Sequence, residues 1–348
     1  MALFRRWPGD VHNGALRIRN FTESDDLLMK ITHEIAMPDF KIVDMHLHLP
    51  VAQDDWLAPW REEFVAENGI GRWEQLKLLK ESEPSWLPSF GFPEPEPPFD
   101  SWQDAARAWS GECERYDLER VVFLTGGGNE MLSAVVKSNP SRFSGFAHHP
   151  PEEPHAAEKL EKAILAQGLS GYKILAPLVK TPLEDRRFDD LFAVCHEHHL
   201  PVLVHFGILG GAGGIVSGAN INPLAIASTA RRFCNAKFII PHFGCGYTDE
   251  LLQLCWACPN VYVDTSGNNL WTKWTMASYT LEQLFAKFYS TIGPQRIIFG
   301  SDSEWFPRGF AVRYLLDQLR AVYSLRWAEP DIRLVFRENA LRLLAQED

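Results

Sequence analysis

Eight short apolar segments alternate with longer amphipathic segments from residue 41 onward, and this alternation limits the possible folds more than any other feature. The apolar segments are rich in β-branched residues, and each is followed by Gly, Pro or polar residues, which is typical of strands. Strands that alternate with helices indicate a parallel sheet, and eight such units predict a closed (β/α)8 TIM barrel of the α/β class. The expected strands are residues 41–46, 120–125, 142–147, 171–175, 201–206, 237–242, 261–266 and 296–301.

The segments between these strands repeat apolar residues at roughly 3.6-residue intervals, which predicts helices. Thr280 stands where a helix-capping residue is expected. The barrel is expected to occupy residues 39–348. The expected helices are residues 153–168, 182–199, 221–233, 280–293, 307–323 and 331–346.

Two regions fall outside the barrel pattern. Residues 1–38 form an N-terminal extension with one predicted helix near residues 24–35. Residues 50–102 form a long insertion after the first strand, rich in Trp and Pro. Long loops in compact domains usually serve as lids or binding loops, and this insertion leaves a strand end where barrel active sites lie. We therefore expect a lid, with a solvent-facing subdomain as the alternative.

Composition limits the function more than the fold. The 348 residues are 46% hydrophobic, enough for one large barrel with insertions. The net charge of −11 argues against a nucleic-acid partner, which would require clustered Lys and Arg. No apolar run approaches the roughly 20 residues that span a bilayer, and no signal peptide is evident. We expect a cytoplasmic protein without a membrane partner, in which Cys255 and Cys258 are buried thiols one helical turn apart.

The motif Asp44-Met45-His46-Leu47-His48 indicates a metal site on the first strand. Residues two apart on a strand point to the same side, so His46 and His48 are expected to face the barrel interior near the end of that strand. Two imidazoles at this spacing can bind one metal ion. The alternative, two core histidines with structural partners, is less favoured for such a pair on the first of eight strands.

Three more polar residues stand at expected strand ends. His205 closes the fifth strand, His242 closes the sixth, and Asp302 follows the eighth. A barrel brings these ends together around one mouth. Imidazoles and a carboxylate suit a borderline divalent ion, zinc first, with manganese, cobalt or iron(II) as alternatives.

These residues resemble the motifs of the amidohydrolase superfamily over residues 41–346. The segments PHFGCG, VYVDTSG, RIIFGSDSEWF and FRENALRLL resemble more narrowly the amidohydrolase-related branch that includes aminocarboxymuconate semialdehyde decarboxylase. The resemblance implies that His46, His48, His205 and Asp302 bind one divalent metal. It also implies that His242 polarises the substrate or orients the reacting water, and it suggests a homodimer.

Lys173, on the expected fourth strand, leaves one question open. In binuclear members of the superfamily a lysine on this strand is carboxylated and bridges two metals. The branch resembled here is mononuclear, which favours an ion pair between the Lys173 ammonium and a nearby carboxylate. Other residues expected to line a substrate pocket are Trp271, Glu304, Trp305 and Arg308.

The preferred function is metal-dependent hydrolysis of an amide, lactone or ester bond in a small organic substrate by a metal-activated water. Asp302 would accept the water's proton, and His242 would stabilise the developing oxyanion. The alternative is nonoxidative decarboxylation of a small aromatic or unsaturated carboxylic acid with the same ligands. A third interpretation, a binding or scaffold protein without catalysis, is disfavoured because no expected ligand is missing from the sequence.

Overall fold

The computed structural model describes residues 35, 37–52, 58–81, 91–208, 218–277 and 279–346. Almost all of the helix expected near residues 24–35 lies outside these residues. No helix among them is long and apolar enough to cross a bilayer.

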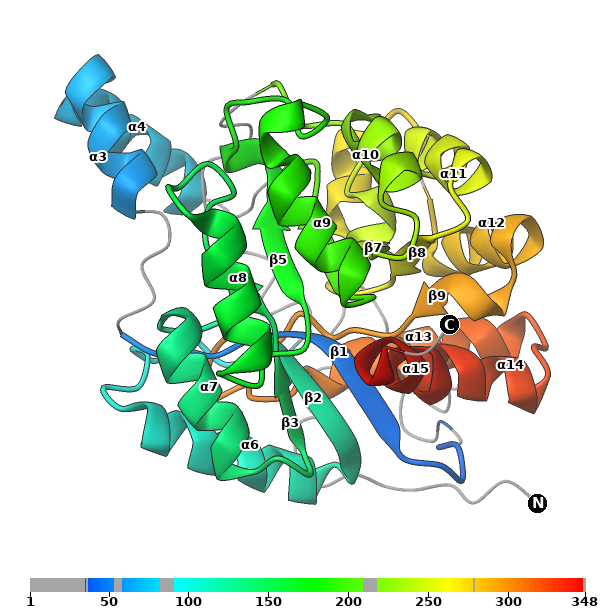
Figure 1. The fold of residues 1–348 in the computed structure, drawn as a ribbon. Coiled ribbons are helices and arrows are strands. Elements are labelled where there is room, and N and C mark those ends of the chain that lie inside the picture. The colour runs from blue at the N-terminus through cyan, green and yellow to red at the C-terminus, as the bar shows by residue number, and fades with distance from the viewer. Residues whose placement is uncertain are drawn as a thin grey trace.

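Parallel strands form the centre of the molecule, in two sheets of order β1-β2-β3 and β4-β5-β6-β7-β8-β9 (Figure 1). All eight expected strands are present, and the third is divided in two. The strands are β1 (Ile42–His48), β2 (Leu118–Thr125), β3 (Phe143–Gly145), β4 (Ala147–His148), β5 (Tyr172–Leu175), β6 (Pro201–His205), β7 (Lys237–Ile240), β8 (Val261–Asp264) and β9 (Ile297–Ile298).

The two sheets join at both seams and close a barrel. At one seam, β3 and β4 are separated by a single residue, Phe146, whose N–H donates to Phe123 O at 2.9 Å. At the other, Met45 N donates to Phe299 O at 3.2 Å and His48 N to Ser303 O at 2.8 Å, so β1 lies beside the chain that leaves β9. The predicted TIM barrel is therefore confirmed.

Helices follow the strands around the barrel, largely where the periodicity predicts them (Figure 1). Thr280 caps its helix, and Gln283 completes a capping box. The α-helices are α3 (Ala58–Asn68), α4 (Ile70–Glu81), α6 (Trp102–Arg115), α7 (Gly128–Ser138), α8 (Ala156–Leu165), α9 (Asp189–Glu197), α10 (Ala227–Arg232), α11 (Thr248–Ala257), α12 (Leu281–Ile292), α13 (Val312–Ser324), α14 (Glu329–Arg333) and α15 (Asn339–Ala345).

Several predicted helix boundaries are wrong. The helix expected from residue 307 begins only at Val312. The backbone N–H groups just before Val312 donate to side chains outside the helix. Phe310 N donates to a Glu112 carboxylate oxygen at 2.7 Å, and Ala311 N donates to Ser303 Oγ at 2.9 Å. The loop after β9 is thereby held against the barrel. Short 3-10 segments replace the first turns of two other expected helices, at Arg186–Phe188 and Pro223–Ile226.

Apolar side chains fill the barrel interior. Val43, Met45, Leu203 and Ile239 belong to this interior cluster, and helix α15 adds Leu343 to it. A second, larger cluster lies between the strands and the surrounding helices. With its lower interior packed, the barrel has room for polar chemistry at the carboxyl ends of its strands.

The described part of the segment between β1 and β2 has two different environments. Helices α3 and α4 pack on each other and project from the barrel (Figure 1). The stretch at 91–99 lies instead along the loop after β9, because Glu96 N donates to Phe306 O at 2.8 Å and the Phe99 and Phe306 ring centroids are 5.2 Å apart. The predicted lid role of residues 50–102 stays a prediction.

Candidate metal centre

A register shift in β1 sets the direction of its histidines. Val43 and Met45 belong to the interior cluster, whereas Leu47 belongs to the outer cluster, although strict alternation would place all three on one face. The change coincides with a register shift between Asp44 and Leu47. Asp44 Oδ1 accepts hydrogen bonds from His46 N at 3.1 Å and Ser301 N at 2.9 Å, which supports the irregular backbone. The common direction predicted for the His46 and His48 side chains therefore depends on a bulge in β1 as well as on strand alternation.

His46 and His48 converge on one carboxylate oxygen. The Nε2 atoms of both rings lie 3.4 Å from Asp302 Oδ1. Nitrogen and oxygen ligands of a tetrahedral zinc, about 2.0–2.1 Å from the ion, are about 3.3–3.4 Å from one another. Each of the two histidine nitrogens thus lies at the spacing from Asp302 Oδ1 that two ligands of one divalent ion would have.

The other ring nitrogens of these histidines are engaged on the side away from Asp302. His46 Nδ1 lies 2.5 Å from Asp264 Oδ2, at the end of β8. His48 Nδ1 lies 2.8 Å from Thr125 Oγ1, at the end of β2. Metal-binding histidines usually donate their second N–H in this way, which fixes the tautomer and leaves Nε2 free for the metal.

His242 approaches the same centre more closely than the resemblance implies. His46, His242 and Asp302 form a group whose potential ligand atoms all lie within 4.8 Å of one another. Nδ1 of His242 lies 3.1 Å from the Ser266 carbonyl oxygen. The ring of His205 lies 5.1 Å from that of His242, and its Nε2 is 3.1 Å from Ile208 O. The roles of His48 and His205 as ligands stay predictions.

Burial favours the neutral, metal-binding form of two of these imidazoles, those of His46 and His205. Desolvation lowers the pKa of His46 to about 4, whereas the negative charge of Asp264 acts to raise that pKa. Desolvation also lowers the pKa of His205 well below its ordinary value. Burial acts to raise the pKa of Asp302, but the hydrogen bond with His48 and the charges of His242 and His46 outweigh it and hold that pKa well below its usual range.

Asp302 sits in a strained backbone position. Its φ of 58° lies in the left-handed region, which non-glycine residues seldom adopt and which is common at active sites. Its N–H donates to His46 O at 2.9 Å. Gly300 permits this close approach, because a Cβ there would lie 2.7 Å from the Cβ of His46. The closeness of His46 therefore explains why a glycine stands two residues before Asp302.

Asp264 is a residue of the candidate site that the sequence analysis missed. It closes β8 in the way that His205 closes β6, so the strand-end argument could have found it. Its side chain is fully buried, and it contacts His46 and also accepts a hydrogen bond from Ser266 N at 2.6 Å. Burial acts to raise the Asp264 pKa, but the charge of His46 and the hydrogen bond with it hold that pKa below its usual value.

We expect Asp264→Asn to weaken metal binding by about 10-fold to 100-fold. The neutral amide no longer gives the His46 ring an anionic acceptor that fixes its orientation. Competition with a chromogenic chelator measures the change. Asp189→Asn is a matched control, since Asp189, on helix α9, pairs with Arg232 on helix α10. An Asp264→Asn variant that binds metal as tightly as the unchanged protein would contradict the orienting role.

Lys173 points toward the barrel interior. It is paired in register with Leu203, which belongs to the interior cluster, and its side chain is 1% exposed. Desolvation lowers its pKa to about 8, whereas the negative charges of Asp302 and Asp264 act to raise that pKa. Both interpretations from the sequence, a second metal site and an ion pair, therefore stay open.

The other histidines of this region have structural partners. His148 Nδ1 donates to Lys173 O at 3.2 Å, and His149 Nε2 donates to Ala156 O at 3.0 Å. Desolvation lowers the pKa of His148 to about 3. These contacts favour the packing role over the pocket-lining one.

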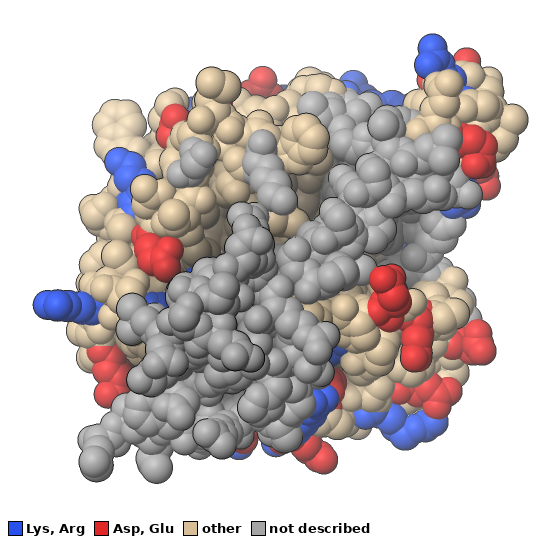
Figure 2. Space-filling view, turned by 180° about the vertical axis from the view of Figure 1, so that it is seen from behind, with Lys and Arg blue, Asp and Glu red and all other residues tan. Residues whose placement is uncertain are grey.

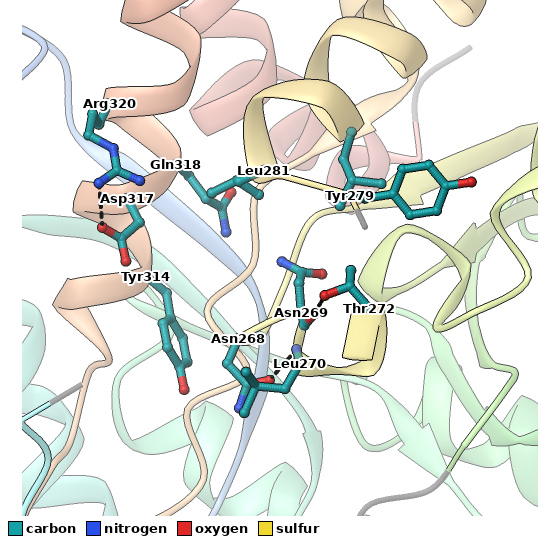
Figure 3. A pocket seen from close by; sticks show the side chains of 12 residues that line it. Asn268, Asn269, Leu270, Thr272, Tyr279, Leu281, Tyr314, Asp317, Gln318 and Arg320 are labelled. Carbon is teal, nitrogen blue, oxygen red and sulfur yellow. Dashed lines mark hydrogen bonds and ion pairs between the residues drawn. The ribbon is translucent and has the colours of Figure 1, made fainter. Parts of the chain in front are cut away.

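A cavity of about 200 Å³ lies beside the centre, between the loop after β8 and helix α13 (Figure 3). Gly267 lines it, and a Cβ at Gly267 would lie 3.3 Å from both Asp302 Oδ2 and His242 Nδ1. The cavity lining is mainly uncharged, and its Asp317 carboxylate pairs with Arg320 at 3.7 Å. The cavity therefore adjoins the candidate metal centre and offers mainly uncharged contacts.

The four expected pocket residues are divided between two loops. Trp271 lies in the 3-10 segment Leu270–Trp274, and its ring lies 6.4 Å from that of the cavity residue Tyr279. Glu304, Trp305 and Arg308 lie in the loop after β9, where Glu304 is exposed and the other two are buried. Only this second group adjoins Asp302 along the chain.

The model of the amidohydrolase family matches residues 43–346. A comparison with curated proteins found no match. Solved structures with the same fold include a probable 2-pyrone-4,6-dicarboxylic acid hydrolase from Acinetobacter baumannii, bound to citric acid. It is 14% identical with a TM-score of 0.55, and the match covers 88% of this chain and 100% of that one.

Two further structures are decarboxylases. One is 5-carboxyvanillate decarboxylase from Novosphingobium aromaticivorans, complexed with manganese, at 13% identity and a TM-score of 0.60, covering 88% of this chain and 96% of that one. The other is 2,6-dihydroxybenzoate decarboxylase from Rhizobium, at 15% identity and a TM-score of 0.53, covering 88% and 98%. At these identities the structures establish the fold alone. The family match establishes more: the chain belongs to the amidohydrolase family, in its aminocarboxymuconate semialdehyde decarboxylase-like branch, and is an amidohydrolase-family enzyme with a candidate His/His/Asp metal site.

Proposed function

We propose that this chain is a metal-dependent hydrolase that cleaves an amide, lactone or ester bond in a small organic molecule. The observation that carries the proposal is the convergence of His46 and His48 on Asp302, each at 3.4 Å, at the open end of a closed barrel. One divalent ion would be held there by His46, His48, His205 and Asp302, with zinc first and manganese, cobalt or iron(II) as alternatives. When bound, such an ion polarises a carbonyl oxygen and makes water nucleophilic near neutral pH.

The protein's own groups would handle the proton and the developing charge. Asp302 is about one-third exposed, so one carboxylate oxygen can accept a proton from water at the mouth and return it to the leaving group. His242 contributes a ring whose Nδ1 lies 3.1 Å from Ser266 O. With Nδ1 so engaged, Nε2 is the ring nitrogen that would stabilise negative charge on the substrate's oxygen.

The surroundings favour a small molecule as substrate. The cavity beside Gly267 is of suitable size for part of such a molecule. On the face shown in Figure 2, Lys and Arg side chains outside the grey region are scattered among Asp and Glu rather than gathered. Three of the solved structures with this fold are named for hydrolysis or decarboxylation of small aromatic or ring-containing acids. We further propose that residues 50–102 act as a lid and that the protein forms a homodimer.

A second candidate is nonoxidative decarboxylation, favoured by the fold shared with 5-carboxyvanillate decarboxylase at a TM-score of 0.60. In that reaction Asp302 would deliver a proton to the carbon that loses CO2. The same side chains would serve both reactions, so product analysis has to separate them.

We expect the metal-loaded protein to convert members of a panel of lactones, esters and amides with uptake of one water per turnover. Mass spectrometry in water enriched in oxygen-18 measures this uptake, and a CO2 assay with hydroxylated benzoates runs in parallel. Asp302→Asn identifies background activity. Release of CO2 without incorporation of oxygen-18 into the product would reject hydrolysis in favour of the second candidate.

A further inference from the structure

Arg308 is a buried cation beside the metal centre. Its side chain is 4% exposed. Its Nη2 donates to the backbone carbonyl oxygen of Asp302 at 3.3 Å, and its Nε is buried without a hydrogen-bond partner. No carboxylate forms an ion pair with Arg308 among the described residues, Glu304 included. The Nε donor of this guanidinium is therefore left unused by the part of the chain that the structure describes.

Aromatic rings surround this guanidinium. Its Cζ lies 4.3 Å from the ring centroid of Trp305, 5.2 Å from that of Phe92 and 6.0 Å from that of Tyr314. Cation–π attraction offsets part of the cost of removing a guanidinium from water. An arginine cannot shed its proton to avoid the rest of that cost. A buried arginine of this kind is expected to have an anionic partner.

The chain supplies carboxylate partners for comparable arginines. Arg313 is 6% exposed, and its Nε, which like that of Arg308 makes no hydrogen bond, forms an ion pair with an Asp317 carboxylate oxygen at 3.2 Å. Arg232 lies 2.8 Å from Asp189. Arg308 is as buried as Arg313 and lies nearer the centre, yet its contacts with the described residues are aromatic rings and a carbonyl group, and Glu304 interacts with it through charge without forming an ion pair. The contrast favours a carboxylate partner supplied by a ligand.

Resting on the proposed function, we propose that Arg308 is a specificity-determining residue whose guanidinium binds a carboxylate group of the substrate. The planar fork of arginine matches a carboxylate bidentately, and the flanking rings suit a flat body. The substrate is then a planar aromatic or unsaturated acid, with its carboxylate at Arg308 and a second polar group at the metal centre. Phe92 comes from the insertion after β1, so the predicted lid contributes to this subsite.

The test compares matched ligands that differ by one charge. Isothermal titration calorimetry measures the binding of phthalate, isophthalate and terephthalate to the metal-loaded protein. The three diacids differ in the distance between their carboxylates, so they sample different separations between Arg308 and the metal centre. Each diacid is compared with its mono-amide, which has the same shape and one carboxylate fewer. We expect at least one diacid to bind about 10-fold to 100-fold more tightly than its mono-amide, as for a charged hydrogen bond.

Substitutions assign that preference to Arg308. In Arg308→Met the preference for the diacid should disappear, while affinity for the mono-amide stays within about threefold. Arg308→Lys keeps the charge but not the fork, so it should retain only part of the preference. Arg313→Met is the control, because its guanidinium has a carboxylate partner in the chain, and it should leave the preference unchanged. If Arg308→Met does not fold, Arg308→Lys and the unchanged protein still decide the question.

Two outcomes would overturn the assignment: no diacid preference in the unchanged protein, or a preference that survives Arg308→Met or Arg308→Lys in full. A parallel loss of affinity for diacid and mono-amide would show instead that Arg308 only supports the Asp302 backbone. Binding requires no turnover. A preference that depends on Arg308 in a protein that hydrolyses nothing would therefore reject the proposed hydrolysis and leave this inference intact.

Discussion

Asp302→Asn is expected to lower kcat/KM by about 1,000-fold or more, because one substitution removes both a proton acceptor and an anionic metal ligand. Asp302 Oδ1 is the point on which His46 Nε2 and His48 Nε2 converge, at 3.4 Å each. An amide of the same shape cannot accept a proton near neutral pH. Steady-state kinetics on the best substrate of the panel measure the loss.

Asp189→Asn is the matched control for this variant and should stay within about twofold of the unchanged protein. The thermal transition of Asp302→Asn should show that the variant is folded. A folded, metal-loaded Asp302→Asn protein with more than a tenth of the original kcat/KM would contradict the proposed role.

His46→Ala is expected to lose both metal and stability. The His46 side chain is 1% exposed and lies against the fully buried carboxylate of Asp264. Its removal leaves that carboxylate with Ser266 N as a partner, and leaving a buried acceptor without one of its donors costs about 1–3 kcal/mol, or more when the acceptor is charged. Bound metal should fall from about one equivalent to below a tenth, because one ligand is missing and the site is distorted.

Denaturant unfolding and elemental analysis measure the two effects separately. The double variant His46→Ala/Asp264→Asn should recover part of the lost free energy of unfolding, since no buried carboxylate is left without its partner. It should not recover metal. A His46→Ala protein that is as stable as the unchanged protein and retains a full equivalent of metal would contradict the geometry described for this pair.

The barrel could be predicted because each strand and helix has a sequence pattern that can be recognised within a short segment. Strands such as Pro201–His205 are short runs of apolar residues, and Thr280 marks a helix start by a mechanism that acts within one turn. The split of the third strand around Phe146 could not be predicted. It arises from pairing with β2 on one side and β5 on the other, which depends on residues far away in the sequence.

The candidate site was predictable to the extent that its residues stand at strand ends. His48 and His205 close their strands, and His46 lies two residues before the end of β1. His242 and Asp302 follow the ends of β7 and β9, and parallel strands bring such ends together. The bulge at Asp44 was not predictable, because it depends on a bond to Ser301 from the opposite end of the chain. The surroundings of Arg308 were hidden for the same reason, since Phe92 reaches it from an insertion with no periodic pattern.

X-ray absorption spectroscopy of the zinc-loaded protein tests the central claim most directly. We predict one zinc per chain with nitrogen and oxygen neighbours only, at about 2.0–2.1 Å, and a clear imidazole signal from several histidines that weakens in His48→Ala. Sulfur neighbours near 2.3 Å, a second metal at about 3.5 Å, or an imidazole signal unchanged in His48→Ala would contradict a single centre built by these side chains.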